Sequence, residues 1–135
     1  MYKLNNSFMS ITLQKTQKLL AAFETNGDKE RFHSLSSFRK NVYGFNILIN
    51  VMLSHLSNES HDICTKERLA KKVGSLASRA TIINFINDQI NTGTLIANNC
   101  SDDRRVKIIK PSSNLARDYE NWLKSLSLFN NKSFS

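Results

Sequence analysis

A chain of 135 residues, 40% of them hydrophobic, is long enough to bury one compact core without covalent staples. Lysine and arginine outnumber aspartate and glutamate by 19 to 11, giving a net charge of +8 that favours either a polyanionic partner or simply a basic, soluble surface. The two cysteines are too few for a disulfide framework and lack paired zinc-site spacing, so we expect a reducing, cytoplasmic compartment. The chain length indicates a single domain over residues 1–135.

The N-terminal segment is predicted to be a helix rather than a signal peptide. Asn, Ser, Thr and Gln interrupt the apolar positions of residues 1–23, so no continuous apolar region forms. The apolar residues between Ile11 and Phe23 indicate a loosely amphipathic helix. It ends at the Thr-Asn-Gly sequence of residues 25–27, where glycine can adopt the left-handed C-cap conformation.

A more apolar helix is predicted from Leu35 to Leu56. Its apolar residues recur at steps of three and four and form a wide stripe, which predicts a helix nearly surrounded by protein. Gly44 costs about 1 kcal/mol relative to alanine, which is tolerable if another helix packs closely there. The apolar run of residues 45–53 is far shorter than the roughly 20 residues needed to cross a bilayer, so no membrane partner is expected.

Two further helices are predicted in the centre of the chain. Residues 61–64 form either a single strand or an extended connection to Thr65, which is the N-cap of a short helix that ends at Gly74. Ser78 is the predicted N-cap of a longer helix that ends near Thr92 and Gly93. The residues expected to face inward are Leu69, Ala70, Val73, Ile82, Ile83, Ile86 and Ile90.

After residue 93 the spacing of apolar residues changes from the helical period to the strand period. Residues 94–97 and 106–110 are rich in β-branched and aliphatic side chains, and the polar residues 98–105 between them favour a turn. The fold class is therefore mainly α with a small β-wing. Helix, turn, helix and hairpin is the order of a winged helix-turn-helix, whose second helix enters the DNA major groove.

The second helix of the pair carries polar residues opposite its apolar face. A period of 3.6 places there Ala80, Thr81, Asn84, Asn87 and Asp88. Asparagine can pair with adenine, threonine can bond a base or a phosphate, and Arg79 can reach a phosphate or guanine. The alternative is a solvated polar face. Because the Asp88 carboxylate is repelled by phosphates, we expect contacts to cluster toward the first turns of this helix.

Phosphate contacts are expected from basic residues of the short helix and the wing. Arg104 or Arg105 is predicted to enter the minor groove, with Asp102 or Asp103 orienting the guanidinium; the alternative is a surface salt bridge. The predicted DNA-binding residues are Lys66, Arg68, Ser78, Arg79, Thr81, Asn84, Asn87, Arg104, Arg105 and Lys107.

Three stretches resemble the MarR-type regulators: residues 68–74, residues 83–96 and residues 103–109, of which the Asp-Arg-Arg of the wing is the most specific. The resemblance implies an obligate homodimer whose winged domains read the half-sites of a pseudo-palindrome, and often a small-molecule pocket. Residues 75–77 make the turn about two residues longer than usual, and Pro111-Ser112 stands where Leu-Thr commonly follows the wing.

The last predicted helix covers residues 113–126. Its aromatic and aliphatic stripe consists of Leu115, Tyr119, Trp122, Leu123 and Leu126. A chain of this size has little interior left for them, so we expect a homodimer formed largely by residues 1–25 and 113–130, with residues 61–110 as the DNA-binding core.

The sequence favours a regulator over an enzyme. It contains no glycine-rich phosphate loop, nucleophile elbow or coordinated acid pair, and we expect no cofactor. The three histidines and two cysteines lack metal-ligand spacing, so no metal is expected. Cys64 and Cys100 are interpreted as small buried hydrophobes, with a redox switch as the alternative if they approach each other.

We therefore predict a sequence-specific regulator that binds double-stranded DNA as a homodimer on a pseudo-palindromic operator, with a small-molecule effector near Tyr43 or Phe45. The alternative is a winged-helix protein-interaction module without specific DNA binding.

Overall fold

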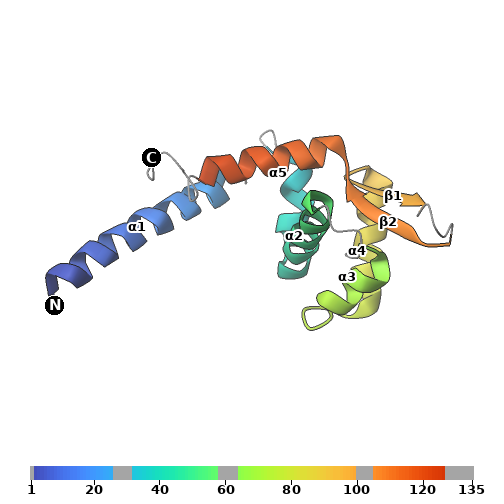
Figure 1. The fold of residues 1–135 in the computed structure, drawn as a ribbon, viewed down its shortest axis with the longest axis horizontal. Helices are drawn as coiled ribbons and strands as arrows, with labels where there is room; N and C mark the ends of the chain where they lie inside the picture. Colours follow the sequence, from blue (N-terminus) through green and yellow to red (C-terminus); the bar gives the residue numbers. More distant parts are fainter. Residues whose placement is uncertain (1, 26–31, 58–63, 100–104, 127–135) are drawn as a thin grey trace. The chain divides into compact units, whose positions relative to one another are not determined.

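The computed structural model describes residues 2–25, 32–57, 64–99 and 105–126 (Figure 1). In chain order the elements are α1 (Tyr2–Thr25), the 3-10 helix η1 (His33–Arg39), α2 (Val42–Leu56), α3 (Lys66–Lys72), α4 (Arg79–Thr92), β1 (Leu95–Asn99), β2 (Lys107–Pro111) and α5 (Ser113–Leu126). The mainly helical fold class with a small β-wing is confirmed. The chain divides into two compact units, one of Ser34–Arg117 and one of Met1–His33 with Asp118–Ser135.

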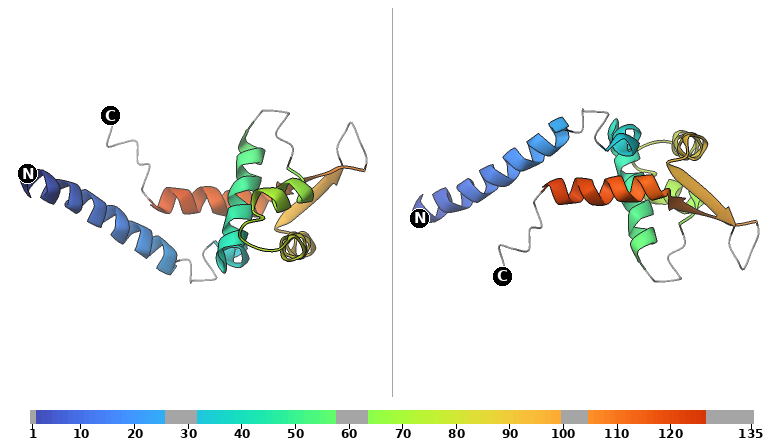
Figure 2. Two further views of the ribbon diagram at one scale, coloured as in Figure 1. Left: turned by 90° about the horizontal axis from the view of Figure 1, so that it is seen from below. Right: turned by 90° about the horizontal axis from the view of Figure 1, so that it is seen from above.

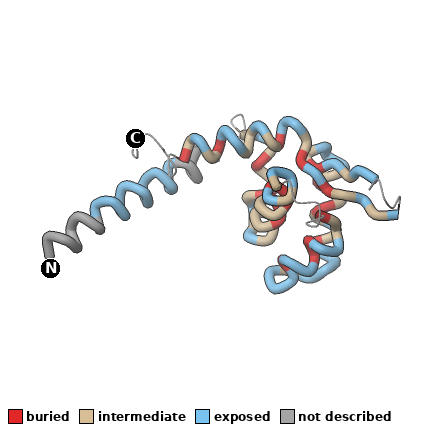
Figure 3. Tube along the Cα trace, in the orientation of Figure 1, coloured by how far each residue is buried: buried red, intermediate tan, exposed pale blue. Residues whose placement is uncertain are grey.

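The larger unit is built around α4. Helix α3 and strand β1 both contact α4, while α2 contacts α4 and β2. Figure 3 shows the buried positions where these elements meet, and Figure 2 shows the hairpin extending away from α2. The side chains that are at most 1% exposed are those of Leu35, Phe38, Ile47, Leu48, Val51, Leu69, Ile82, Ile86, Leu95, Ile109 and Leu115.

The β-wing is a two-stranded antiparallel hairpin, in which Leu95 lies opposite Pro111 and Asn99 opposite Lys107. Each strand is displaced toward the C-terminus from its predicted range. Thr94 lies outside β1 because its backbone N–H donates to the Gln89 carbonyl at the end of α4, at 3.0 Å. Pro111 lies within β2 at the end of the ladder, a position that tolerates the missing N–H of proline.

The prediction of one helix from Leu35 to Leu56 was wrong. Helix η1 ends at Arg39 and α2 begins at Val42. The break occurs at Asn41, which has an extended backbone and whose side-chain oxygen accepts a hydrogen bond from the Gly44 N–H at 2.7 Å. Asparagine is among the strongest N-cap residues, so the apolar period continued while the helix did not.

Helix α2 is also less covered than predicted. Gly44, Ile47, Leu48, Val51 and Met52 are buried. A second set of apolar residues on a different face is at least 60% exposed: Val42, Leu53 and Leu56. The described chain thus covers only one side of this helix.

Gly44 allows a close approach of three elements. A Cβ atom at this position would lie 2.8 Å from Asn41 Oδ1, 2.9 Å from the Phe38 carbonyl oxygen and 3.1 Å from Cζ of Phe85 on α4. The Phe85 ring also meets the rings of Phe38 and Tyr43 edge to face, at centroid distances of 5.5 and 5.6 Å. The condition under which a glycine inside this helix is tolerable, close packing of another helix, is therefore met at Gly44.

The smaller unit contains α1, which ends at Thr25 as predicted. The described side chains of α1, residues 10–21, are all exposed. They include four large apolar residues that are 40–58% exposed: Ile11, Leu13, Leu19 and Leu20. No described helix combines the length and hydropathy that a membrane crossing requires.

Helix α5 has the predicted bounds and belongs partly to each unit. The Ser112 hydroxyl caps its first turn by accepting from the Leu115 N–H at 3.1 Å. The predicted stripe is present as one helix face, but the expectation that a single chain has too little interior to cover it was wrong. Leu115, Trp122 and Leu126 are buried in the single chain, and Tyr119 and Leu123 are half-buried. Burial raises the pKa of the Tyr119 phenol.

Candidate nucleic-acid interface

Two capped helices, α3 and α4, form the centre of the candidate site. The Thr65 hydroxyl accepts from the Arg68 N–H at 3.2 Å, and the Ser78 hydroxyl accepts from the Thr81 N–H at 3.2 Å. Gly93 ends α4 in the left-handed conformation, with φ of 88°. All three cap predictions are confirmed, because capping depends on a few neighbouring residues.

The exposed side of α4 is the polar face that its sequence predicts. Arg79, Ala80, Thr81, Asn84 and Asp88 are exposed, and Asn87 is half-buried. The Ser78 hydroxyl also donates to the Thr81 hydroxyl oxygen at 2.9 Å. Ser78 and Thr81 therefore stabilise the start of this helix.

The inward side of α4 differs from the prediction. Ile82 and Ile86 are buried, but Ile83 and Ile90 are only half-buried. A rotation of roughly 100° per residue places these two on the flank of the helix. The third buried side chain is Gln89, which the apolar pattern had missed.

Gln89 fits in the core because its polar atoms have partners. Its side-chain oxygen accepts hydrogen bonds from the Ser37 hydroxyl at 2.9 Å and from the Thr94 hydroxyl at 2.7 Å. A buried polar group without such partners would cost about 1–3 kcal/mol. Gln89 thus joins α4 to η1 and to the start of the wing.

Arg79, the first residue of α4, is paired with Glu67 of α3. Its Nε donates to Glu67 Oε2 at 3.2 Å, and its Nη2 donates to Glu67 Oε1. These hydrogen bonds lower the pKa of the Glu67 carboxyl and raise the pKa of Arg79, so the pair stays charged at neutral pH. Sequence reasoning missed this pair because the two residues come from different helices.

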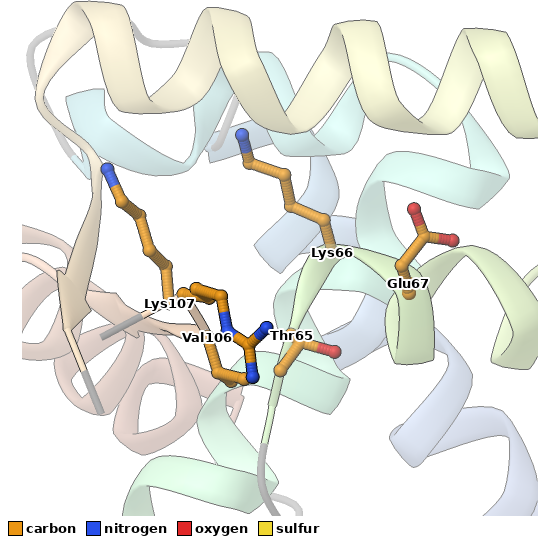
Figure 4. Close-up of a pocket in the computed structure, with 6 residues that line it drawn as sticks. Thr65, Lys66, Glu67, Val106 and Lys107 are labelled. Atoms are coloured by element: carbon orange, nitrogen blue, oxygen red, sulfur yellow. The ribbon is translucent and has the colours of Figure 1, made fainter. Parts of the chain in front are cut away.

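A hollow of about 420 Å³ lies between the start of α3 and the start of β2. It is lined by Thr65, Lys66, Glu67, Arg105, Val106 and Lys107 (Figure 4). The Lys66 and Lys107 side chains extend in the same direction, and Lys66 lies between Lys107 and Glu67 in this view (Figure 4). The fold thus brings together three of the predicted DNA-binding residues, Lys66, Arg105 and Lys107.

The remaining predicted residues lie elsewhere. Arg68 is exposed on α3, while Asn84 and Asn87 lie one and two turns along α4 from Arg79. Arg104 and both predicted orienting aspartates, Asp102 and Asp103, lie outside the described residues. The roles of these side chains in DNA binding stay predictions.

Cys64 is buried and lies beside the wing, since its carbonyl oxygen accepts a hydrogen bond from the Ile109 N–H at 2.8 Å. The segment before α3 therefore reaches β2 through Cys64, while residues 61–63 and Cys100 lie outside the described residues. Within the described ranges, no group of three or more His, Cys, Asp or Glu side chains is placed to hold a metal ion.

Comparison with known proteins supports the fold. No family model and no curated protein sequence matches the chain at a significant level. Among solved structures, the chain is similar to the crystal structure of CouR from Rhodococcus jostii RHA1 bound to p-coumaroyl-CoA. The matched region covers 76% of this chain and 66% of the CouR chain, with a TM-score of 0.50 and 15% sequence identity. A second match is the heme sensor protein PefR in complex with heme and carbon monoxide. It covers 89% of this chain and 79% of the PefR chain, with a TM-score of 0.43 and 15% sequence identity.

The match to CouR, a MarR-family regulator, concerns the fold. It agrees with the order of α3, α4 and the β1–β2 hairpin, which is the order of a winged helix-turn-helix. The predicted resemblance to MarR-type regulators is confirmed at the level of the fold.

Proposed function

We propose that this chain, which has the winged-helix fold of MarR-type regulators, is a non-enzymatic cytoplasmic protein that regulates transcription by binding double-stranded DNA sequence-specifically as a homodimer. The observation that carries the proposal is the hollow in which Lys66, Arg105 and Lys107 come together. Glu67, which also lines this hollow, is paired with the first residue of α4. Phosphate contacts and base contacts would then come from adjacent parts of one surface.

In this proposal α4 enters the major groove with its first turns. Thr81 and Asn84 are exposed there, so their side chains can reach base edges or phosphates. Asp88 is exposed one turn after Asn84 and opposes deeper insertion, because phosphates repel a carboxylate. Lys66 and Lys107 neutralise phosphates, and Arg105 and Arg104 contact the backbone or the minor groove beside the wing.

The homodimer is supported by the apolar surface of α1. Leu13 and Leu20 are seven residues apart, which places them on nearly the same helix face, and they are 57% and 58% exposed. A second copy of the chain would bury this exposed face of α1. Two-fold symmetry would then present two α4 helices to half-sites of a pseudo-palindrome, with a spacing of roughly 10 base pairs or a multiple of it.

We expect light scattering at micromolar concentration to give twice the 15.4 kDa mass of one chain. Replacing Leu13 and Leu20 together by aspartate should give the monomer mass, because two carboxylates would be buried in the interface. The helical circular dichroism signal should be retained, since both side chains are exposed in the single chain. A monomeric wild-type protein, or a dimer that survives both substitutions, would contradict this interface.

Selection of bound fragments from a random DNA pool tests the proposed function. We expect enrichment of one pseudo-palindromic sequence and a steep salt dependence. Six or more phosphate contacts in a dimer lower the affinity by about a thousandfold between 50 and 200 mM salt. Weak binding without enrichment and without salt dependence would instead favour the alternative, a winged-helix module that binds other proteins.

A small-molecule effector is also part of the proposal. CouR was crystallised with p-coumaroyl-CoA. In this chain Tyr43 and Phe45 on α2 are half-buried, and the Tyr43 ring contacts Phe85 of α4. A ligand that displaced these rings would act directly on the helix proposed to read DNA.

A further inference from the structure

We infer that Glu67 is a positioning residue that orients Arg79 to read a guanine in the major groove, an inference that rests on the proposed DNA-binding function. Arg79 is the first residue of α4, directly after the Ser78 cap. The N-terminal residues of a recognition helix are the ones that contact base edges. Glu67 holds the Arg79 guanidinium from α3 through two hydrogen bonds.

The geometry of the pair determines which edge of the guanidinium remains available. Glu67 occupies Nε and one N–H of Nη2, which together form the side edge of the planar group. The end edge, made of Nη1 and the second N–H of Nη2, has no partner among the described residues. This two-donor edge matches the O6 and N7 acceptors of guanine, the commonest bidentate pairing of arginine in the major groove.

The charge of the pair favours a base over a phosphate. Glu67 neutralises Arg79, so the pair as a whole attracts the phosphate backbone little. Hydrogen bonds to guanine depend on the direction of the donors, and that direction is what the carboxylate holds in place. The pair has little value for stability, because the two side chains are 66% and 61% exposed and exposed ion pairs contribute little to folding.

The test uses full-length Glu67→Ala and Arg79→Ala variants and a library of the selected operator in which each base pair is varied. Wild type should prefer a G·C pair at one position of each half-site by about 5- to 140-fold. Both single variants and the double variant should lose this preference to the same extent, because Glu67 acts through Arg79. Glu67→Ala should also bind random DNA as tightly as wild type or more tightly, with an unchanged melting temperature.

Glu120→Ala is the matched control. It removes the same charge from another exposed carboxylate, which is paired with Lys124 at 3.3 Å on α5, and it should keep the guanine preference. The inference is overturned if Glu67→Ala keeps that preference, or if Arg79→Ala only makes the salt dependence shallower, which would place Arg79 on a phosphate. A wild-type protein that enriches no sequence would instead overturn the proposed function itself.

Discussion

Replacing Lys66 and Lys107 together by alanine should lower the affinity for every DNA sequence by about four-thousandfold near 0.1 M salt. Each phosphate contact contributes roughly 0.9 to the slope of log affinity against log salt, and the proposed dimer would lose four contacts. The slope should therefore become shallower by about 3.6. Titrations of the selected operator and of a random duplex between 50 and 200 mM salt measure both quantities.

Two control variants distinguish the effect of the lysines in the hollow from the effect of net charge. Lys15→Ala with Lys18→Ala removes the same charge from exposed positions of α1 and should leave the slope nearly unchanged. Asn84→Ala should keep the slope and relax the preference at one base pair by about 1–3 kcal/mol. If the Lys66 and Lys107 double variant and the Lys15 and Lys18 double variant lose DNA affinity equally, net charge and not the hollow determines affinity.

Replacing Gly44 by alanine should destabilise the larger unit by about 2–3 kcal/mol, as expected when atoms are added to a closely packed site. The added Cβ would lie within 3.0 Å of two oxygen atoms, one of which belongs to the Phe38 backbone and cannot rotate away. Relief requires a shift of α2 relative to η1 and to Phe85 of α4. Urea unfolding measures the loss of stability, and operator titrations measure the effect of displacing α4, the proposed recognition helix.

Gly93→Ala is the control for Gly44→Ala. A Cβ added at Gly93 would meet no other described atom within 4 Å, but φ is 88°, so the expected cost of about 1–2 kcal/mol comes from the backbone alone. DNA affinity of the folded protein should then change little. If Gly44→Ala costs no more than Gly93→Ala, the close approach at Gly44 does not limit the packing of α2.

The order of elements was predictable because it depends on neighbouring residues. Thr65, Ser78 and Gly93 mark helix ends through interactions that span only a few positions. The change from a helical to a strand period likewise predicted the wing. Asn41 caps α2 through an equally local interaction. The prediction for residues 35–56 rested on the continuous apolar period alone, so it missed the break between η1 and α2.

By itself, the sequence determined the winged helix-turn-helix order and the polar face of α4, since both follow from the periods of helix and strand. Only the tertiary structure decided which distant side chains meet. Packing of α3 on α4 pairs Glu67 with Arg79, and the hairpin carries Lys107 back to Lys66 across some forty residues of sequence. Gln89 has a buried position for the same reason: its partners, Ser37 and Thr94, come from other elements of the fold.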